Sequence, residues 1–411
     1  MAADLTTYDK ILKEDYAPSI EKQFNSRTVL LNTVKRDSTT IEGREFIVPT
    51  QGRLTEGVGS RSGTSASLPT AGDVGYDNAT YLPKYHWGKI AVSQVIIEHT
   101  KRDSGAFTKA VTSETKGLAE TMSLDLNRQA WNDGTGRISD CGTTSNSTTV
   151  VLGTLTAGVT PQKYRALGNG RLRVGMYVDL LVHTTGAVLA TNRKITAIDK
   201  ANNTITIDGA AVTTDTTHGV YRAGNKVLTV NNEINGLRNI ISASGAVGVL
   251  NPATAGQEYW AAAVLDGDTP GTNQTISEVR MLKVVDLAEE GSTGKIKMVL
   301  GSTPVRRAYF NLLVGLKRTV NSMTYEGGWK GLDFNGMAFL TDLDATPNQI
   351  QFLDPEHLKW YELARPQWMD ADGSILKWDQ GTGYVATYYW FANLGTDARN
   401  TQGVLKDVTE S

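Results

Sequence analysis

The chain has 411 residues, of which 40% are hydrophobic and 20% are charged, an ordinary globular composition with room for about two to three domains. A formal net charge of −2 gives no overall electrostatic field that would attract nucleic acid or an anionic membrane. The single cysteine, Cys141, excludes an intramolecular disulfide framework. With no signal-peptide pattern and no apolar run of about 18 residues, synthesis in the cytoplasm is the simplest expectation.

The first 42 residues have the pattern of an extended arm rather than of a domain. Tyr8, Ile11 and Leu12 fall at helical spacing until Pro18 interrupts the pattern, and the apolar residues that follow have few partners of their own. Exposed apolar groups of this kind need a covering surface. We therefore expect Tyr8, Ile11 and Leu12 to contact another copy of the chain.

Residues 43–100 form a long excursion from the body of the chain, and this segment has too few large apolar side chains to build a core of its own. Strand-like sequences at 45–48 and 90–97 enter and leave it, and a glycine-rich tract from Gly52 to Gly75 lies between them. Loops longer than about 12 to 15 residues are usually functional or disordered. The sequence predicts a long hairpin that is held by a neighbouring molecule.

Four charged residues of this tract are candidates for contacts between subunits, namely Arg53, Glu56, Arg61 and Asp73. A purely solvated role for them stays open, because exposed ion pairs contribute only about 0 to 1 kcal/mol each.

The clearest helix follows the excursion. It is predicted from an N-cap at Asp103 or Ser104 to Trp131, and its length would be roughly 40 Å. One apolar stripe runs along it, made of Phe107, Val111, Leu118, Met122, Leu126 and Ala130. A helix of this length serves as a spine for other elements.

The composition changes sharply after this helix. Residues 138–229 are rich in threonine and contain short β-like runs, among them a predicted hairpin of 195–198 with 204–207 around a five-residue loop. We predict an inserted all-β domain, a small barrel or sandwich, around which the rest of the chain closes into one fold.

From residue 231 onward, helices and strands are mixed. A helix is predicted over 275–290, started by a capping box of Thr275 and Glu278, with Ile276, Val279, Leu282, Val285 and Leu287 on its apolar side. Another helix is predicted from Thr303. Strands are predicted at 295–300, 336–340, 349–353 and 384–391, and 358–363 is predicted to pair with 375–378. This order favours an α+β fold over a doubly wound sheet.

No pattern in the sequence points to catalysis or to a bound metal. The five histidines have no metal-ligand spacing, and residues 291–295 lack the spacing of a phosphate-binding loop. Residues 59–63 place Arg61 where a nucleophile elbow needs serine. We therefore expect no catalytic residue, no metal site and no cofactor.

The order of these parts resembles that of tailed-bacteriophage major capsid proteins, whose fold is shared with herpesvirus capsid floors. Three C-terminal stretches strengthen the resemblance: Phe339-Leu340-x-Asp342, Ile350-x-Phe352-Leu353-Asp354-Pro355-x-x-Leu358, and Tyr384-x-Ala386-x-Tyr388-Tyr389 followed by Asn393-Leu394-Gly395. The resemblance implies an N-terminal arm at 1–42, an extended E-loop hairpin at 43–100, and a peripheral domain with the spine helix at 101–137 and 230–241. It also implies a mostly axial domain at 242–411, with an unplaced border near 275–300. Residues 138–229 would be the inserted all-β domain that some relatives carry.

The resemblance implies a structural role without enzymatic activity. The chain would self-assemble through pentamers and hexamers into an icosahedral virion capsid around a phage double-stranded DNA genome, in the host bacterial cytoplasm. Implied partners are further copies of the chain, a separate scaffolding protein, a portal protein and genomic DNA on the inner face without sequence specificity; a decoration protein is an open option, and no membrane is involved. Because the tract from Gly52 to Gly75 contains no lysine, the lysine-based covalent E-loop link of some relatives is not expected.

Two other classes of function stay open at this point. A phage or cell-surface binding protein would hold a ligand in its β-rich domain, with Trp260, Trp360 and Trp368 as stacking residues, although tryptophans more often lie in cores. A carboxylate-dependent hydrolase would use two acidic residues of the C-terminal part.

Overall fold

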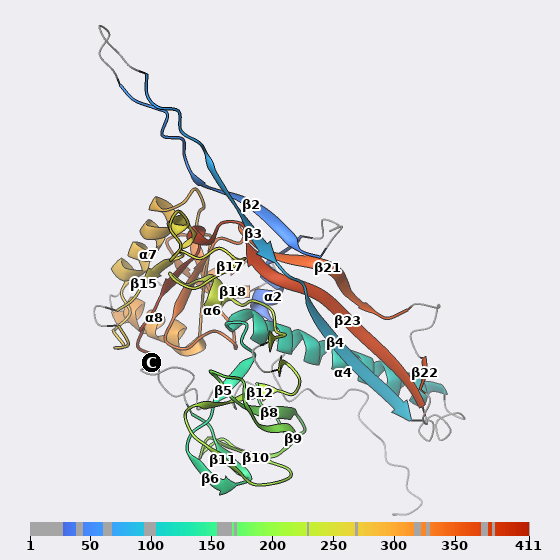
Figure 1. The fold of residues 1–411 in the computed structure, drawn as a ribbon. Coiled ribbons are helices and arrows are strands. Elements are labelled where there is room, and N and C mark those ends of the chain that lie inside the picture. Colours follow the sequence, from blue (N-terminus) through green and yellow to red (C-terminus); the bar gives the residue numbers. More distant parts are fainter. Residues whose placement is uncertain are drawn as a thin grey trace, which may run out of the picture.

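The computed structural model describes residues 28–37, 44–60, 68–93, 104–153, 167, 171–227, 230–267, 270–315, 322–325, 329–370, 377–379 and 383–410. Over these residues the chain is a mixed α+β protein, as predicted. It consists of a central sheet beside a long helix, a second sheet with two helices, a β-rich body and a projecting ribbon (Figure 1).

The central sheet consists of long strands that run beside helix α4 (Figure 1). Strand β23 pairs antiparallel with β4, β21 and β22, and β1 pairs parallel with β21. The strands are β1 (Lys35–Asp37), β4 (Lys84–Ser93), β21 (Leu358–Trp368), β22 (Lys377–Asp379) and β23 (Gly383–Thr396). Trp360 and Trp390 are almost fully buried, with ring centroids 5.1 Å apart, and anchor the core of this sheet.

Two predictions about this sheet are wrong. The strand that leaves the excursion, β4, does not pair with the strand that enters it, because Phe46–Arg53 (β2) pairs with Gly75–Tyr81 (β3). Strand β4 joins the central sheet instead, since its alternation buries His86, Ile90 and Val92 on one side. The paired part of the projecting hairpin is therefore formed by β2 and β3, and β4 does not belong to it.

The second wrong prediction concerns 358–363 and 375–378, which do not pair with each other because both segments pair with β23. As a result, β21, β22 and β23 all lie in the central sheet beside α4. The strands within the range 242–411 are thus divided between two sheets.

Helix α4 (Ser104–Trp131) has the extent that the sequence predicts. Met122, Leu126 and Ala130 of its apolar stripe are buried. The short helix α2 (Val29–Thr33) packs against it and brings Val29, Leu30 and Leu31 into the same core. The N-terminal segment is thereby fixed to the spine from residue 28 onward.

A buried carboxyl group, Asp342, joins α2 to α4. Its Oδ2 accepts a hydrogen bond from the backbone N–H of Leu30 at 3.2 Å, and its Oδ1 accepts one from the Asn127 side-chain amide at 3.0 Å. Burial raises the pKa of Asp342, and the nearby carboxylate of Asp344 raises it further. The ionised form of Asp342 is therefore less favourable in the folded chain than in the unfolded chain.

We expect the variant Asp342→Asn to gain stability relative to the unmodified chain as the pH rises from about 4 to about 7. The pKa of Asp342 is higher in the folded state, so folding favours the protonated form, and stability is lost as pH rises above the unfolded-state pKa. Asparagine has no such titration. Urea unfolding of both chains at several pH values measures the difference, in which titrating groups that do not interact with Asp342 cancel. A difference that stays constant with pH would contradict the expectation.

The β-rich body is formed by residues 137–222 and has a core of its own, which includes Ile138, Val178, Ile195 and Val220. Its main sheet has the order β5-β12-β8-β9-β10-β7, and β6 pairs with β11 beside it. The strands are β5 (Arg137–Asp140), β6 (Thr144–Ser147), β7 (Thr149–Val151), β8 (Tyr177–Val182), β9 (Val188–Asp199), β10 (Thr204–Ile207), β11 (Val212–Thr214) and β12 (His218–Arg222). The predicted hairpin is confirmed as β9 and β10, with Ile198 opposite Ile205. A two-stranded ribbon of β13 (Lys226–Val227) and β14 (Val230–Asn231) follows.

The only cysteine of the sequence, Cys141, lies in the core of this body. Burial raises the pKa of its thiol to about 12, with further contributions from Asp140 and Asp215. Since the thiolate is the reactive form, we expect no alkylation of the native chain at pH 8 and rapid alkylation in denaturant. Labelling with iodoacetamide at increasing urea should therefore report the opening of the β-rich body. Labelling in buffer at the rate of a free thiol would contradict this expectation.

The second sheet has the order β15-β24-β20-β16-β19-β18-β17 and lies beside helices α7 (Glu278–Glu290) and α8 (Thr303–Gly315) (Figure 1). Its strands are β15 (Ala263–Leu265), β16 (Met298–Gly301), β17 (Ser322–Tyr325), β18 (Trp329–Phe334), β19 (Met337–Thr341), β20 (Ile350–Leu353) and β24 (Gly403–Leu405). Short helical segments at Leu237–Ile240 (α6), Glu258–Trp260 and Arg399–Thr401 complete the described elements.

Helix α7 differs from its prediction. It begins at Glu278 with Ser277 as N-cap, two residues after the predicted N-cap Thr275, and the Ser277 side chain makes no capping hydrogen bond. Met281, Val284, Val285 and Ala288 are buried, whereas three residues of the predicted apolar side, Val279, Leu282 and Leu287, are exposed. The helix thus has two apolar faces, and only one of them packs on its own sheet.

Candidate assembly surfaces

The β2–β3 ribbon projects from the rest of the molecule (Figure 1). Leu54, Val58 and Leu68, which lie beyond its paired part, are 77%, 81% and 86% exposed. Large apolar side chains exposed to this degree mark surfaces that other molecules cover. A two-stranded hairpin by itself is only marginally stable in water.

The base of the ribbon is fixed to the body by Tyr259. The Tyr259 hydroxyl donates a hydrogen bond to Oδ2 of Asp77 at 2.9 Å and lies 3.1 Å from Oγ1 of Thr50. A Cβ at Gly52 would lie 1.9 Å from the Tyr259 ring, so only glycine permits this approach. The direction in which the ribbon leaves the body is thereby set.

The structure places three of the seven predicted contact residues, since Tyr8, Ile11, Leu12 and Arg61 lie outside the described residues. Arg53, Glu56 and Asp73 are all exposed on the ribbon. Arg53 leans over its own hairpin, because its Nε lies 2.4 Å from where a Cβ at Gly75 would be. Whether these three side chains contact a neighbour remains a prediction.

An aromatic cluster on the central sheet was not predicted from the sequence. Tyr85 and Trp87 of β4 are both 57% exposed. They pack against Phe391 of β23 at centroid distances of 5.1 and 4.9 Å, and Tyr389 lies 5.9 Å from Trp87. We call these four residues the aromatic patch. The sequence could have indicated this patch, because side chains alternate between the two faces of a strand. Residues 85 and 87 therefore share one face, and so do residues 389 and 391.

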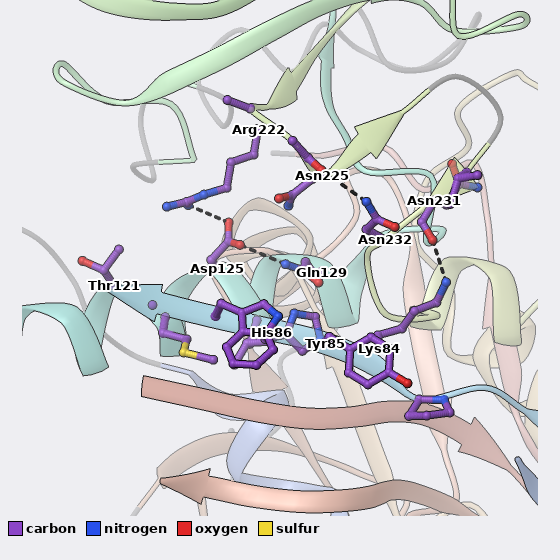
Figure 2. Close-up of a pocket in the computed structure, with 18 of the residues that line it drawn as sticks. Lys84, Tyr85, His86, Thr121, Asp125, Gln129, Arg222, Asn225, Asn231 and Asn232 are labelled. Carbon is purple, nitrogen blue, oxygen red and sulfur yellow. Dashed lines mark hydrogen bonds and ion pairs between the residues drawn. The ribbon is translucent and has the colours of Figure 1, made fainter. Parts of the chain in front are cut away.

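A pocket of about 590 Å³ lies between β4, α4 and the β13–β14 ribbon (Figure 2). Lys84 Nζ donates a hydrogen bond to the carbonyl of Asn231 at 2.6 Å, and Arg222 forms an ion pair with Asp125 at 3.1 Å. His86 lies in the same pocket, and burial lowers its pKa to about 4, so its imidazole is neutral at pH 7. The pocket has mixed polar and aromatic walls.

Within the described residues, no group of three or more histidine, cysteine, aspartate or glutamate side chains could hold a metal ion. A search of the same residues for a helix of sufficient length and apolarity to cross a membrane finds none.

Similarity to known proteins lies in structure rather than in sequence. No protein-family model and no curated protein sequence matches the chain. Its structure is similar to the capsid protein of cyanophage A-1(L), with a TM-score of 0.60, 12% identity, and coverage of 99% of this chain and 100% of the other. The chain has the capsid fold of tailed bacteriophages.

The capsid fold is also found in two further matches, each with a TM-score of 0.50. One is the SrpI encapsulin of Synechococcus elongatus, at 7% identity over 99% of this chain and 96% of the other. The other is the capsid of a native GTA particle, at 10% identity over 97% and 96% of the two chains. All three matches come from assembled shells or encapsulin complexes.

Proposed function

We infer that this chain is the major capsid protein of a tailed bacteriophage, which self-assembles through pentamers and hexamers into an icosahedral shell around double-stranded DNA. The observation that carries the proposal is the ribbon, whose apolar side chains Leu54, Val58 and Leu68 have no cover within the described chain. The likeness of the whole chain to shell proteins supports it.

The energetics of such a shell follow from repeated apolar contacts. Full burial of one leucine or valine side chain contributes about 1.5 to 3 kcal/mol, whereas an exposed ion pair contributes about 0 to 1 kcal/mol. The ribbon and the aromatic patch would therefore supply most of the contact energy. Arg53, Glu56, Arg61 and Asp73 would set register, and Tyr8, Ile11 and Leu12 of the arm would add apolar contacts.

The parts of the chain take the following roles in the proposal. The hairpin of residues 46–81 is the E-loop, and α4 with the central sheet forms the peripheral domain. The second sheet with α7 and α8 is the axial domain, and the β-rich body is the inserted domain on the outer face. The exposed apolar face of α7, with Val279, Leu282 and Leu287, is a further contact surface between subunits.

The proposed partners are other copies of the chain, a separate scaffolding protein, a portal protein and the packaged DNA, with a decoration protein as an open option. A net charge of −2 supports weak contact with DNA that is independent of sequence. The proposed location is the virion capsid, assembled in the host cytoplasm.

The binding-protein alternative loses two of its three candidate stacking residues. Trp260 and Trp360 are 1% and 0% exposed, so neither is free to stack on a ligand, and Trp368 packs on Tyr388 at 5.0 Å. For the hydrolase alternative, one acidic pair of the C-terminal part, Asp342 and Asp344, is buried and hydrogen-bonded to Asn127, so this pair is not accessible to a substrate.

Expression of the full chain, alone and together with its candidate scaffolding protein, tests the proposal. We expect closed shells of uniform diameter in negative-stain images and a fast-sedimenting boundary in ultracentrifugation. Small discrete oligomers under both conditions would overturn the proposal.

A further inference from the structure

A second, smaller cavity lies where five parts of the chain meet. Its lining comes from the last turn of α4, the start of β5, Arg171 in the segment before β8, helix α6 and the loop that precedes β20. Five of its lining side chains carry hydrogen-bond donors and no acceptor: Arg128, Trp131, Arg137, Arg171 and Arg238. The proposed shell contacts do not use this cavity.

One of these donors has no partner. The indole Nε1–H of Trp131 forms no hydrogen bond, although the residue is only 2% exposed. A buried donor without an acceptor costs about 1 to 3 kcal/mol. An indole nitrogen can only donate, so the missing partner must be an acceptor.

The carboxylates of the region hold the arginines but do not line the cavity. Arg128 binds Glu233 through two hydrogen bonds of 3.1 and 2.5 Å, Arg137 lies 3.0 Å from Asp140, and Arg171 binds Asp344 at 3.0 Å. Among the described residues, the cavity is lined by four guanidinium groups and by no acidic side chain. The charged side chains that line the cavity are therefore all positive, and their carboxylate partners lie outside its lining.

The size of the cavity restricts its occupant to a single small species. The volume within which the centre of a water-sized sphere can move is about 10 Å³. One water molecule needs about this much space. Sulfate and phosphate are too large. A water molecule would also have to donate its two hydrogens, and Asn132 and Thr346 are the only lining side chains that accept.

From the four guanidinium groups that line the cavity, the absence of an acidic side chain from its described lining and the orphan indole, we propose that the cavity binds one monatomic anion of the halide type, chloride under cellular conditions. The ion accepts from Trp131 Nε1–H and from the surrounding guanidinium groups. It ties the base of the β-rich body to the spine helix, so halide binding stabilises the fold.

Halide-dependent unfolding of the full chain tests the proposal. At constant ionic strength, replacement of sodium gluconate by sodium chloride or bromide should raise the unfolding midpoint along a saturating curve, as linkage requires. The variant Trp131→Phe keeps the aromatic ring and removes the donor. Its halide affinity should fall about tenfold or more, since a hydrogen bond to a charged group is worth that much.

The matched control is Trp260→Phe. Trp260 is equally buried and donates its Nε1–H to the carbonyl of Val247 at 2.9 Å, and it does not line the cavity. This variant should be less stable but keep the halide dependence of the unmodified chain. Equal unfolding midpoints in gluconate and chloride, or an unchanged halide dependence in Trp131→Phe, would overturn the proposal in favour of a water molecule.

A second measurement does not depend on any variant. Crystals of the unmodified chain grown in bromide should show an anomalous peak next to Trp131 Nε1. Electron density at that position without an anomalous signal would identify a water molecule and overturn the proposal.

Discussion

Replacement of Arg399 by alanine should prevent folding or lower the free energy of unfolding by more than about 4 kcal/mol. Arg399 is fully buried, and its guanidinium donates to four backbone carbonyls, those of Asn239, Ile240, Ser244 and Gly245, at 2.8 to 3.0 Å. Burial lowers its pKa to about 10, so the charge is retained at pH 7. Alanine would leave all four carbonyl groups without a donor.

Urea unfolding followed by circular dichroism measures this effect. Arg399→Lys retains the charge with three donors and a different geometry, so we expect an intermediate loss. Arg307→Ala is the control, because Arg307 is exposed on α8 and its removal should change the free energy of unfolding by no more than about 0.5 kcal/mol. A loss below about 1 kcal/mol for Arg399→Ala would show that the carbonyls find other donors.

The role of Arg399 illustrates what the sequence alone does not reveal. Its four acceptors lie about 150 to 160 positions earlier in the chain, and no local sequence pattern predicts them. The same is true of β4, whose partner β23 is close to the opposite end of the sequence. Pairings between distant segments depend on the whole fold, so periodicity identifies the strands but not their neighbours.

Local patterns were sufficient where the pattern itself decides the structure. Helix α4, the β9–β10 hairpin and strand β23 all follow from the spacing of apolar residues and turns. Helix α7 shows where the spacing of apolar residues is not sufficient to predict the core. It has two apolar faces. Met281 is buried and Val279 is exposed because only the face that carries Met281 packs on the sheet.

The candidate contact surfaces were predicted only in part. The glycine-rich tract correctly indicated a long projecting hairpin, because so few of its side chains could build a core. The aromatic patch was missed because Tyr85 and Phe391 come together only when β4 and β23 pair. The orphan indole of Trp131 likewise depends on the contacts of distant segments.

A triple replacement of Leu54, Val58 and Leu68 by aspartate should abolish shell formation and leave the fold of the subunit intact. These side chains are at least 77% exposed, so the subunit loses no core contact, whereas a neighbour would have to bury three charges. Thermal unfolding should therefore be unchanged while negative-stain images show no shells. The matched control is a triple replacement by aspartate of three exposed apolar residues of the β-rich body, Val174, Val188 and Leu189. This variant should still form shells. Normal shells from the ribbon variant would rule out the ribbon as the main contact between subunits.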